Sequence, residues 1–241
     1  MNPAPFCLIG IVNVTPDSFS DGGKYIDPRN AVAHGLHLLD EGAGMLDLGA
    51  ESTRPFAEPV PEGEEIARLM PVVAGLRGQR PEAILSVDTL VYGNIINSRT
   101  HHRPLEACME TLSRFTELKR KNPELSIHAF NLVARVAAYD SDAEDPDYWA
   151  SYGRKIWRYA CLTDKAERGE ADEAERGECA ALRREIPDGV LADFLARRAV
   201  DRAVNLACVD LVRDGVFDVL TVPKDDTAEY GDAALDQMAI A

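Results

Sequence analysis

Two polar loops carry side chains that could bind phosphate. Each follows a short apolar run, and together they supply hydroxyl groups, carboxylates, backbone N–H groups beside glycines and one arginine: Asn13, Thr15, Asp17, Ser18, Asp21, Glu51, Ser52, Thr53 and Arg54. An arginine fork and clustered N–H donors are the usual parts of a phosphate site. An asparagine near carboxylates can hold Mg²⁺, which prefers oxygen ligands and shares them with substrate phosphates. The alternative is an ordinary loop-rich surface.

A third polar position, Asp88, follows an apolar run at 84–87. A lone aspartate at the end of a strand can accept hydrogen bonds from a ring N–H and an amino group at once. Ligands of parallel α/β proteins bind beyond the carboxyl ends of the strands. Because right-handed crossovers bring successive carboxyl ends to the same side, we expect Asn13, Thr53, Arg54 and Asp88 at one edge of one sheet.

Five apolar runs predict the strands of that sheet, at 6–12, 44–49, 84–87, 125–133 and 216–222. Segments whose apolar residues have helical spacing separate these runs. The part of the chain after residue 90 is richer in such segments than the part before it. The pattern predicts an α/β fold with a mainly parallel sheet of about five strands. Five strands are too few to close an eight-stranded barrel, so an open sheet or an incomplete (β/α) barrel is expected.

Two features of the helix-rich part are specific enough to test. A long helix is expected over 188–213, with Gly215 just beyond its end. The sequence A-E-R-G-E occurs at 166–170 and again at 174–178. We interpret this charged stretch as a solvated connector between helices.

The composition restricts the partners of the protein. The chain has 241 residues and a net charge of −15, with 26 Lys and Arg against 41 Asp and Glu. So acidic a protein is a poor nucleic-acid binder, because it has no excess of basic residues to displace counterions. The run at 6–12 has no basic residue before it and is too short to span a bilayer, so we expect no secretory signal and no membrane segment. Five scattered cysteines without a C-x-x-C motif predict reduced thiols in a cytoplasm.

Three motifs near the start of the chain resemble dihydropteroate synthase. They read G-I-V-N-V-T-P-D-S-F-S-D-G-G-K-Y at 10–25, G-A-E-S-T-R-P at 49–55 and S-V-D-T at 86–89. The resemblance implies a (β/α)₈ barrel of folate biosynthesis. It also implies an enzyme that transfers the methylene carbon of a dihydropterin pyrophosphate to p-aminobenzoate and releases pyrophosphate with Mg²⁺.

Within this resemblance, the first loop carries the catalytic residues. Asn13 is implied to contact the metal–pyrophosphate and is the implied Mg²⁺ ligand. Asp17 and Asp21 are implied to belong to the mobile first loop. Arg54, from the second loop, completes the implied catalytic set.

Substrate binding is implied for the second and third motifs. Ser52, Thr53 and Arg54 are implied to lie near the pyrophosphate and the aminobenzoate. Asp88 is implied to bind the pterin. Ala50 is a small departure, because the family usually has a second glycine there.

The resemblance to dihydropteroate synthase ends after the third motif. The later pterin asparagine, the D-P-G-x-G-F segment, the S-x-K lysine and the closing R-x-H pair have no match. Instead, D-x-L-V-Y-G at 88–93 and H-A-F-N at 128–131 resemble a second bacterial family with no assigned activity. The sequence therefore indicates a hybrid. We expect a βαβαβ segment at 1–89 and a helix-rich segment at 90–241, packed on the same sheet.

The sequence leaves three functions open. The first is a transferase of the dihydropteroate synthase type, impaired by its missing residues, with dihydropterin pyrophosphate and p-aminobenzoate as substrates. The second is a phosphate- or pterin-binding protein without catalysis. The third is an activity of the second family, around Asp88, Arg135 and the pair Asp225–Asp226, which could bind a cation or equally be acidic turn residues. The sequence leaves the oligomeric state open.

Overall fold

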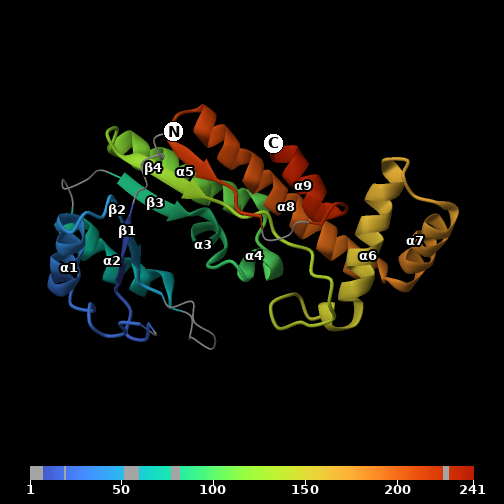
Figure 1. Cartoon of the computed structure of the whole chain (residues 1–241), viewed down its shortest axis with the longest axis horizontal. Helices are drawn as coiled ribbons and strands as arrows, with labels where there is room; N and C mark the ends of the chain where they lie inside the picture. Colours follow the sequence, from blue (N-terminus) through green and yellow to red (C-terminus); the bar gives the residue numbers. More distant parts are fainter. Residues whose placement is uncertain (1–7, 19, 52–59, 77–81, 225–227) are drawn as a thin grey trace, which may run out of the picture. The chain divides into compact units, whose positions relative to one another are not determined.

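The chain divides into two units that are described separately. The computed structural model describes residues 8–18, 20–51, 60–76, 82–224 and 228–241 (Figure 1). One unit comprises Met1–Ile84 with Glu124–Ser126. The other comprises Leu85–Pro123 with Ile127–Ala241.

The first unit is built on two parallel strands. β1 (Ile9–Asn13) pairs with β2 (Met45–Gly49). The helices α1 (Pro28–Asp40) and α2 (Glu62–Leu76) complete this unit. Its core is a small cluster of buried residues: Val12, Val14, Ala31, Ala50, Val72 and Leu76.

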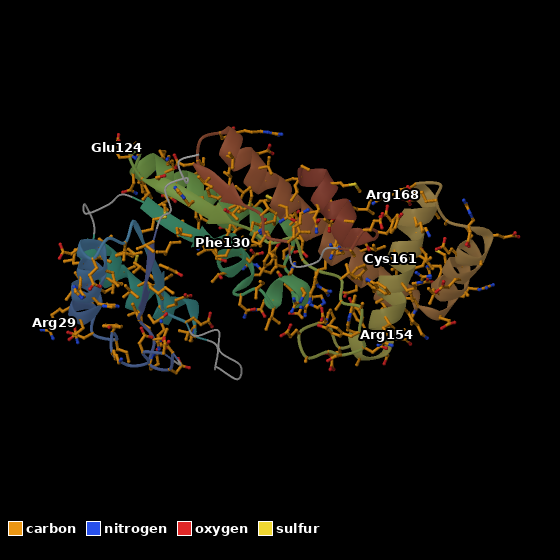
Figure 2. All side chains as sticks on the ribbon, viewed as in Figure 1. Arg29, Glu124, Phe130, Arg154, Cys161 and Arg168 are labelled. Atoms are coloured by element: carbon orange, nitrogen blue, oxygen red, sulfur yellow. The ribbon has the colours of Figure 1, made fainter. Side chains whose placement is uncertain are left out.

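Helix α1 begins where its local sequence predicts. The carboxylate of Asp27 accepts a hydrogen bond from the backbone N–H of Arg29 at 2.9 Å and so caps the helix. Pro28 occupies the first helical turn, where its missing N–H costs no hydrogen bond. The exposed side chain of Arg29, which is labelled in Figure 2, also pairs with Asp27.

A three-stranded sheet contains the remaining strands. Its order is β3 (Glu82–Ser86), β4 (Ser126–Phe130), β5 (Val219–Thr221). β4 and β5 are parallel, with His128 opposite Val219. Asp218 strengthens the start of this pair, because its carboxylate accepts a hydrogen bond from the backbone N–H of Ile127 at 2.8 Å.

Helices form most of the second unit. They are α3 (Val87–Tyr92), α4 (Asn97–Thr100), α5 (Leu105–Lys121), α6 (Trp149–Glu167), α7 (Glu173–Glu185), α8 (Asp188–Arg213) and α9 (Asp232–Ile240). Figure 1 shows α8 as the longest of them, with α9 beside it. A large core cluster lies among α6, α8 and α9: Val136, Ala137, Trp149, Ile156, Ile186, Leu191, Phe194 and Ala233.

The α/β class, the parallel pairing and the helix-rich second half are confirmed, but the expectation of one sheet is wrong. The five strands form a two-stranded and a three-stranded sheet, and neither closes into a barrel in the described residues. The reason is physical: periodicity identifies a strand but not its partner.

The predicted connector at 166–178 is also wrong in its second half. There, Asp172 caps the start of α7, and the side chains of Asp172 and Glu175 each accept a hydrogen bond from the backbone N–H of the other. None of the described helices is long and apolar enough to cross a membrane.

Candidate functional site

The carboxyl end of the β1–β2 pair carries the first candidate residue. Asn13 is the last residue of β1 and lies opposite Gly49, the last residue of β2. A Cβ atom on Gly49 would lie 3.7 Å from the side-chain oxygen Oδ1 of Asn13. The half-buried amide of Asn13 therefore stands at the strand edge where parallel α/β proteins bind ligands.

A hydrogen-bond network holds Asn13 to the loop that follows it. Its Nδ2 atom donates to Oδ1 of Asp21 at 2.9 Å and to Oγ of Ser18 at 3.3 Å. Ser20 donates to the same oxygen of Asp21 at 3.0 Å. Burial raises the pKa of Asp21, but these hydrogen bonds outweigh it, and the net pKa is lowered. Asp21 is therefore ionised at neutral pH.

Backbone hydrogen bonds close this loop into a compact turn. The N–H of Gly23 donates to the carbonyl of Thr15, and the N–H of Gly22 donates to the carbonyl of Ser18, each at 2.9 Å. Gly23 has a φ of +80°, which favours glycine. A Cβ atom on Gly22 would lie only 2.6 Å from the carbonyl oxygen of Ser18. The D-G-G sequence is thus required by the shape of the loop.

This loop can offer oxygen atoms to a cation. Because Nδ2 of Asn13 is already used by Asp21 and Ser18, the amide group is oriented and its Oδ1 atom faces the Gly49 side. The described residues contain no group of three or more His, Cys, Asp or Glu side chains that could hold a metal ion. A hard cation at Asn13 would therefore need further oxygen ligands, such as phosphate oxygens, as Mg²⁺ commonly has.

Several predicted site residues lie outside the described residues: Ser52, Thr53, Arg54, Asp225 and Asp226. The positions flanking the second loop are described, and Oε1 of Glu51 accepts a hydrogen bond from the N–H of Val60 at 3.1 Å. Arg68 donates to the carbonyl of Ala50 at 3.0 Å. Asp17 is half-buried in the first loop.

Asp88 lies in the first turn of α3, directly after β3, and is only 4% exposed. Its Oδ1 atom accepts a hydrogen bond from Nδ2 of Asn131 at 3.1 Å. Its Oδ2 atom accepts one from the N–H of Leu132 at 2.9 Å. Burial raises the pKa of Asp88 to about 6, although both hydrogen bonds lower it. Asp88 is thus a buried carboxylate whose two oxygens both have partners.

The sequence alone did not reveal these partners of Asp88. Asn131 closes the H-A-F-N motif, and its Oδ1 accepts a hydrogen bond from Asn205 of α8, which also donates to the carbonyl of Leu132 at 3.1 Å. Only the motif at 128–131 hinted at this network. The expected single sheet edge is not formed, because Asn13 ends a strand of one sheet and Asp88 follows a strand of the other.

The fold and the polar residues at the ends of its strands define an α/β protein. It has two parallel sheets, and the loop after its first strand is of the kind that binds ligands. Residues 66–241 match the family described as "Protein of unknown function (DUF4127)". Since this match covers most of the chain, the protein belongs to that family. Residues 9–97 match the family described as "Pterin binding enzyme". The hybrid indicated by the motifs is thereby confirmed.

The N-terminal segment has close relatives. It is 48% identical over 89 residues to a dihydropteroate synthase of Mycobacterium leprae, covering 37% of this chain and 31% of the relative. It is 50% identical over 82 residues to the dihydropteroate synthase of Bacillus subtilis, covering 34% of this chain and 28% of the relative. The chain thus matches about a third of the length of these relatives.

A solved dihydropteroate synthase of Yersinia pestis in complex with a sulfonamide drug is 22% identical. The alignment covers 97% of this chain and 91% of that one, with a TM-score of 0.35. This score is too low to carry the fold of that enzyme over to this chain.

Proposed function

We propose that residues 9–97 bind the pyrophosphate end of a dihydropterin pyrophosphate and that the chain transfers its pterin to p-aminobenzoate only poorly. The observation that carries the proposal is the oriented Asn13 amide, fixed by Asp21 at the carboxyl end of β1. The 48% identity to a dihydropteroate synthase over this segment supports it. The activity is thus of the transferase type and belongs to folate biosynthesis.

The residues of both loops have distinct roles in this proposal. Oδ1 of Asn13 would help to hold Mg²⁺, which would offset the charge of the two phosphate groups when bound. Asp17 and Asp21 would shape the loop around the pyrophosphate. Thr53 and Arg54 would bind phosphate and aminobenzoate oxygens, since an arginine fork suits both anions.

Ser52 would add a hydroxyl donor to the second loop, and Asp88 would be the remaining pterin contact. Both oxygens of Asp88 accept hydrogen bonds from Asn131 and Leu132, so a pterin would have to displace them. The lysine and R-x-H motifs of the dihydropteroate synthase family also have no match in the sequence. The loss of one oriented electrostatic group typically lowers the rate by about 10²–10³-fold. The chain should therefore still bind pyrophosphate although its turnover is largely lost.

The proposal also covers the location of the protein, its two segments and its ligands. A reducing, cytoplasmic location is supported by Cys108 and Cys208, which are buried thiols. In this proposal the dihydropteroate-synthase-like segment comprises residues 1–89 and the helix-rich segment comprises residues 90–241. The ligands would be small molecules, and the net charge of −15 argues against nucleic acid.

Calorimetric titration of the full chain tests this proposal. Dihydropterin pyrophosphate should bind, and more tightly with Mg²⁺, whereas the hydroxymethyl dihydropterin without pyrophosphate should bind far more weakly. Arg54→Ala should weaken binding by about 1.5–3 kcal/mol, the usual value of a charge-assisted hydrogen bond. Arg29→Ala, which removes an exposed arginine at the start of α1, is the matched control and should have no effect. Equal affinity for both ligands, or equal effects of the two variants, would contradict the proposal.

A further inference from the structure

Asp88 lies in a tightly held part of the second unit, although the proposed function assigns it a pterin ligand. Its carboxylate accepts hydrogen bonds from Nδ2 of Asn131 at 3.1 Å and from the N–H of Leu132 at 2.9 Å. Asp88 is 4% exposed and Asn131 is 2% exposed. Both donors belong to the stretch 131–135, which follows β4. A pterin can reach Asp88 only if this stretch gives way.

The first two residues of the stretch are tied to α8 and β5. The side-chain amide of Asn205 donates to Oδ1 of Asn131 and, at 3.1 Å, to the carbonyl of Leu132. The backbone N–H of Asn131 donates to the carbonyl of Thr221 at 3.2 Å. Because both the oxygen and the nitrogen of the Asn131 amide are bonded, it cannot turn away from Asp88 without also losing Asn205.

The next two residues are held by the backbone and by an arginine. Val133 forms a parallel β-bridge with Lys224 and is 1% exposed. The carbonyl of Ala134 accepts a hydrogen bond from Nη1 of Arg198 at 3.0 Å, in a buried position. The centre of the stretch is therefore fixed to both the sheet and α8.

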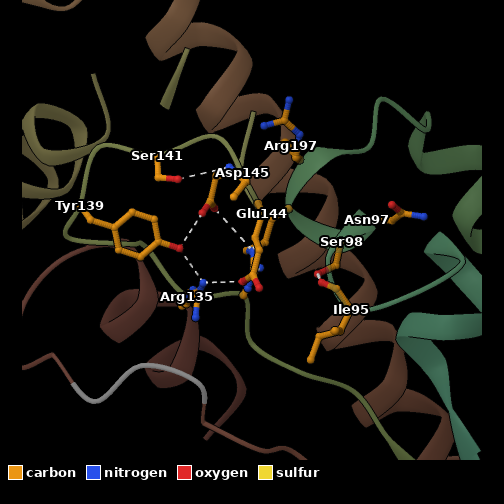
Figure 3. A network of polar contacts seen from close by, with 12 residues as sticks. Ile95, Asn97, Ser98, Arg135, Tyr139, Ser141, Glu144, Asp145 and Arg197 are labelled. Carbon is orange, nitrogen blue, oxygen red and sulfur yellow. Dashed lines mark hydrogen bonds and ion pairs between the residues drawn. The ribbon is translucent and has the colours of Figure 1, made fainter. Parts of the chain in front are cut away.

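Arg135 ends the stretch in a network of charged side chains (Figure 3). Its Nη2 atom donates to Oε2 of Glu144 at 2.9 Å and to the hydroxyl of Tyr139 at 2.6 Å. Glu144 also accepts from Arg99 of α4 at 2.9 Å, and the Tyr139 hydroxyl donates to Asp145 at 3.0 Å. Each residue of the stretch thus has a contact that keeps the two donors on Asp88.

A pterin at Asp88 would exchange one pair of donors for another. It would offer a ring N–H and an amino group to two oxygens that already accept from an amide and a backbone N–H. The number of hydrogen bonds to Asp88 would not increase, whereas Asn131 and Leu132 would each lose an acceptor. A buried donor without an acceptor costs more free energy than one additional hydrogen bond contributes. The exchange is therefore unfavourable.

We propose that Asp88 is closed to pterins and that the loop at Asn13 takes diphosphate monoesters as a class, without selecting for a pterin group. The inference rests on the proposed function, because it needs that loop to bind the pyrophosphate end. It names what the site selects, which is the diphosphate with Mg²⁺ and not the organic group attached to it. The loss of the remaining pterin contact is a further reason for poor transfer.

Calorimetric titration of the full chain at a fixed Mg²⁺ concentration compares two probes. Dihydropterin pyrophosphate carries the pterin, and methyl diphosphate carries the same diphosphate on a single carbon. We expect their dissociation constants to agree within about threefold. Asn13→Ala should weaken the binding of both probes by the same factor, and Asn30→Ala, which removes an exposed amide from α1, should weaken neither. A larger preference for dihydropterin pyrophosphate would overturn the inference.

Two backbone amides distinguish the two ends of the ligand by NMR. The signal of the Gly23 N–H, in the loop after Asn13, should shift on saturation with either probe. The Leu132 N–H should keep its hydrogen-exchange rate, because it still donates to Asp88. Faster exchange of Leu132 with dihydropterin pyrophosphate alone would overturn the inference and leave the proposed function intact. If neither probe moved the Gly23 signal, the proposed function would itself fail, and the inference with it.

Discussion

The side-chain amide of Asn131 donates a hydrogen bond to Oδ1 of Asp88 at 3.1 Å and so links the end of β4 to the end of β3. The same carboxylate accepts from the N–H of Leu132. Asp88 is the residue to which the dihydropteroate synthase resemblance assigns pterin binding. In this chain it is bound by residues of the segment that matches the second family. The two resemblances therefore meet at one buried carboxylate.

Asp88 should make the stability of the protein fall as the pH rises. Burial raises its pKa in the folded state to about 6, above its ordinary value of 3.8. Between these values the folded chain binds more protons than the unfolded chain, so its free energy of unfolding decreases with increasing pH. Two pKa units correspond to roughly 3 kcal/mol as an upper bound. This contribution is complete below about pH 4 and is lost above about pH 6.

Asp88→Asn isolates this effect from the other carboxylates. Urea unfolding of both proteins at pH 4.5, 5.5 and 7 gives the difference in their free energies of unfolding. This difference should shift in favour of Asp88→Asn as the pH rises. A difference that stays constant across the three pH values would show that Asp88 has an ordinary pKa in the folded protein.

The long helix of the second unit could be predicted from local patterns, but the pairing of β3 with β4 could not. The helix at 188–213 is observed with those bounds, because Pro187 precedes its first residue and Gly215, with a φ of +70°, follows its end. These are local signals. The ends of β3 and β4 are linked by hydrogen bonds that Asp88 accepts from residues more than forty positions away, and periodicity does not contain that information.

Helix α7 was missed for a different reason. Its capping pair, Asp172 and Glu175, is visible in the sequence, but none of its residues is buried. An apolar stripe is the usual signal of a helix, and α7 has little of one to show. The loop at Asn13, in contrast, was predicted from a motif, and the structure connects Asn13 with Asp21 directly.

The link from Asn13 to Asp21 predicts how the loop responds to mutation. Asn13→Ala removes a hydrogen-bond donor from the carboxylate, so the pKa of Asp21 should rise. A ¹³C NMR titration of the aspartate carboxyl groups measures this. Asp27, whose pKa is lowered to about 2 mainly by its hydrogen bonds with Arg29, serves as the internal control and should not move. An unchanged Asp21 would mean that the network does not form in solution.

Gly153 should tolerate no side chain, although it lies within helix α6. A Cβ atom there would lie 2.3 Å from the carbonyl oxygen of Tyr139 and 2.5 Å from the ring of Trp149. Gly153→Ala should therefore destabilise the protein by about 1–3 kcal/mol, as overpacking commonly does. A Cβ atom on Gly177, inside α7, would have no neighbouring atom within 4 Å, so Gly177→Ala should stabilise by about 0.5–1 kcal/mol. Chemical denaturation of both variants measures their free energies of unfolding. Equal changes in the two variants would contradict this prediction.

One buried carboxylate links α9 to α8. Asp236, with a side chain only 3% exposed, pairs through one oxygen with Arg198 and through the other with Arg202. Asp236→Ala would leave the buried guanidinium of Arg198 without its counter-ion, and breaking a buried pair in this way typically costs about 3–5 kcal/mol. Repacking cannot easily relieve this loss, because Nη1 of Arg198 is held by the carbonyl of Ala134.

A surface ion pair on α8 provides the control for Asp236. Asp210 and Arg213 form an ion pair at 3.1 Å with both side chains mostly exposed. Asp210→Ala should therefore cost about 0–1 kcal/mol and less at high salt. Urea unfolding at low and high salt should show a large loss for Asp236→Ala that salt barely changes, because the pair is buried. If Asp236→Ala cost no more than Asp210→Ala, the contact between α8 and α9 would have to be apolar in origin.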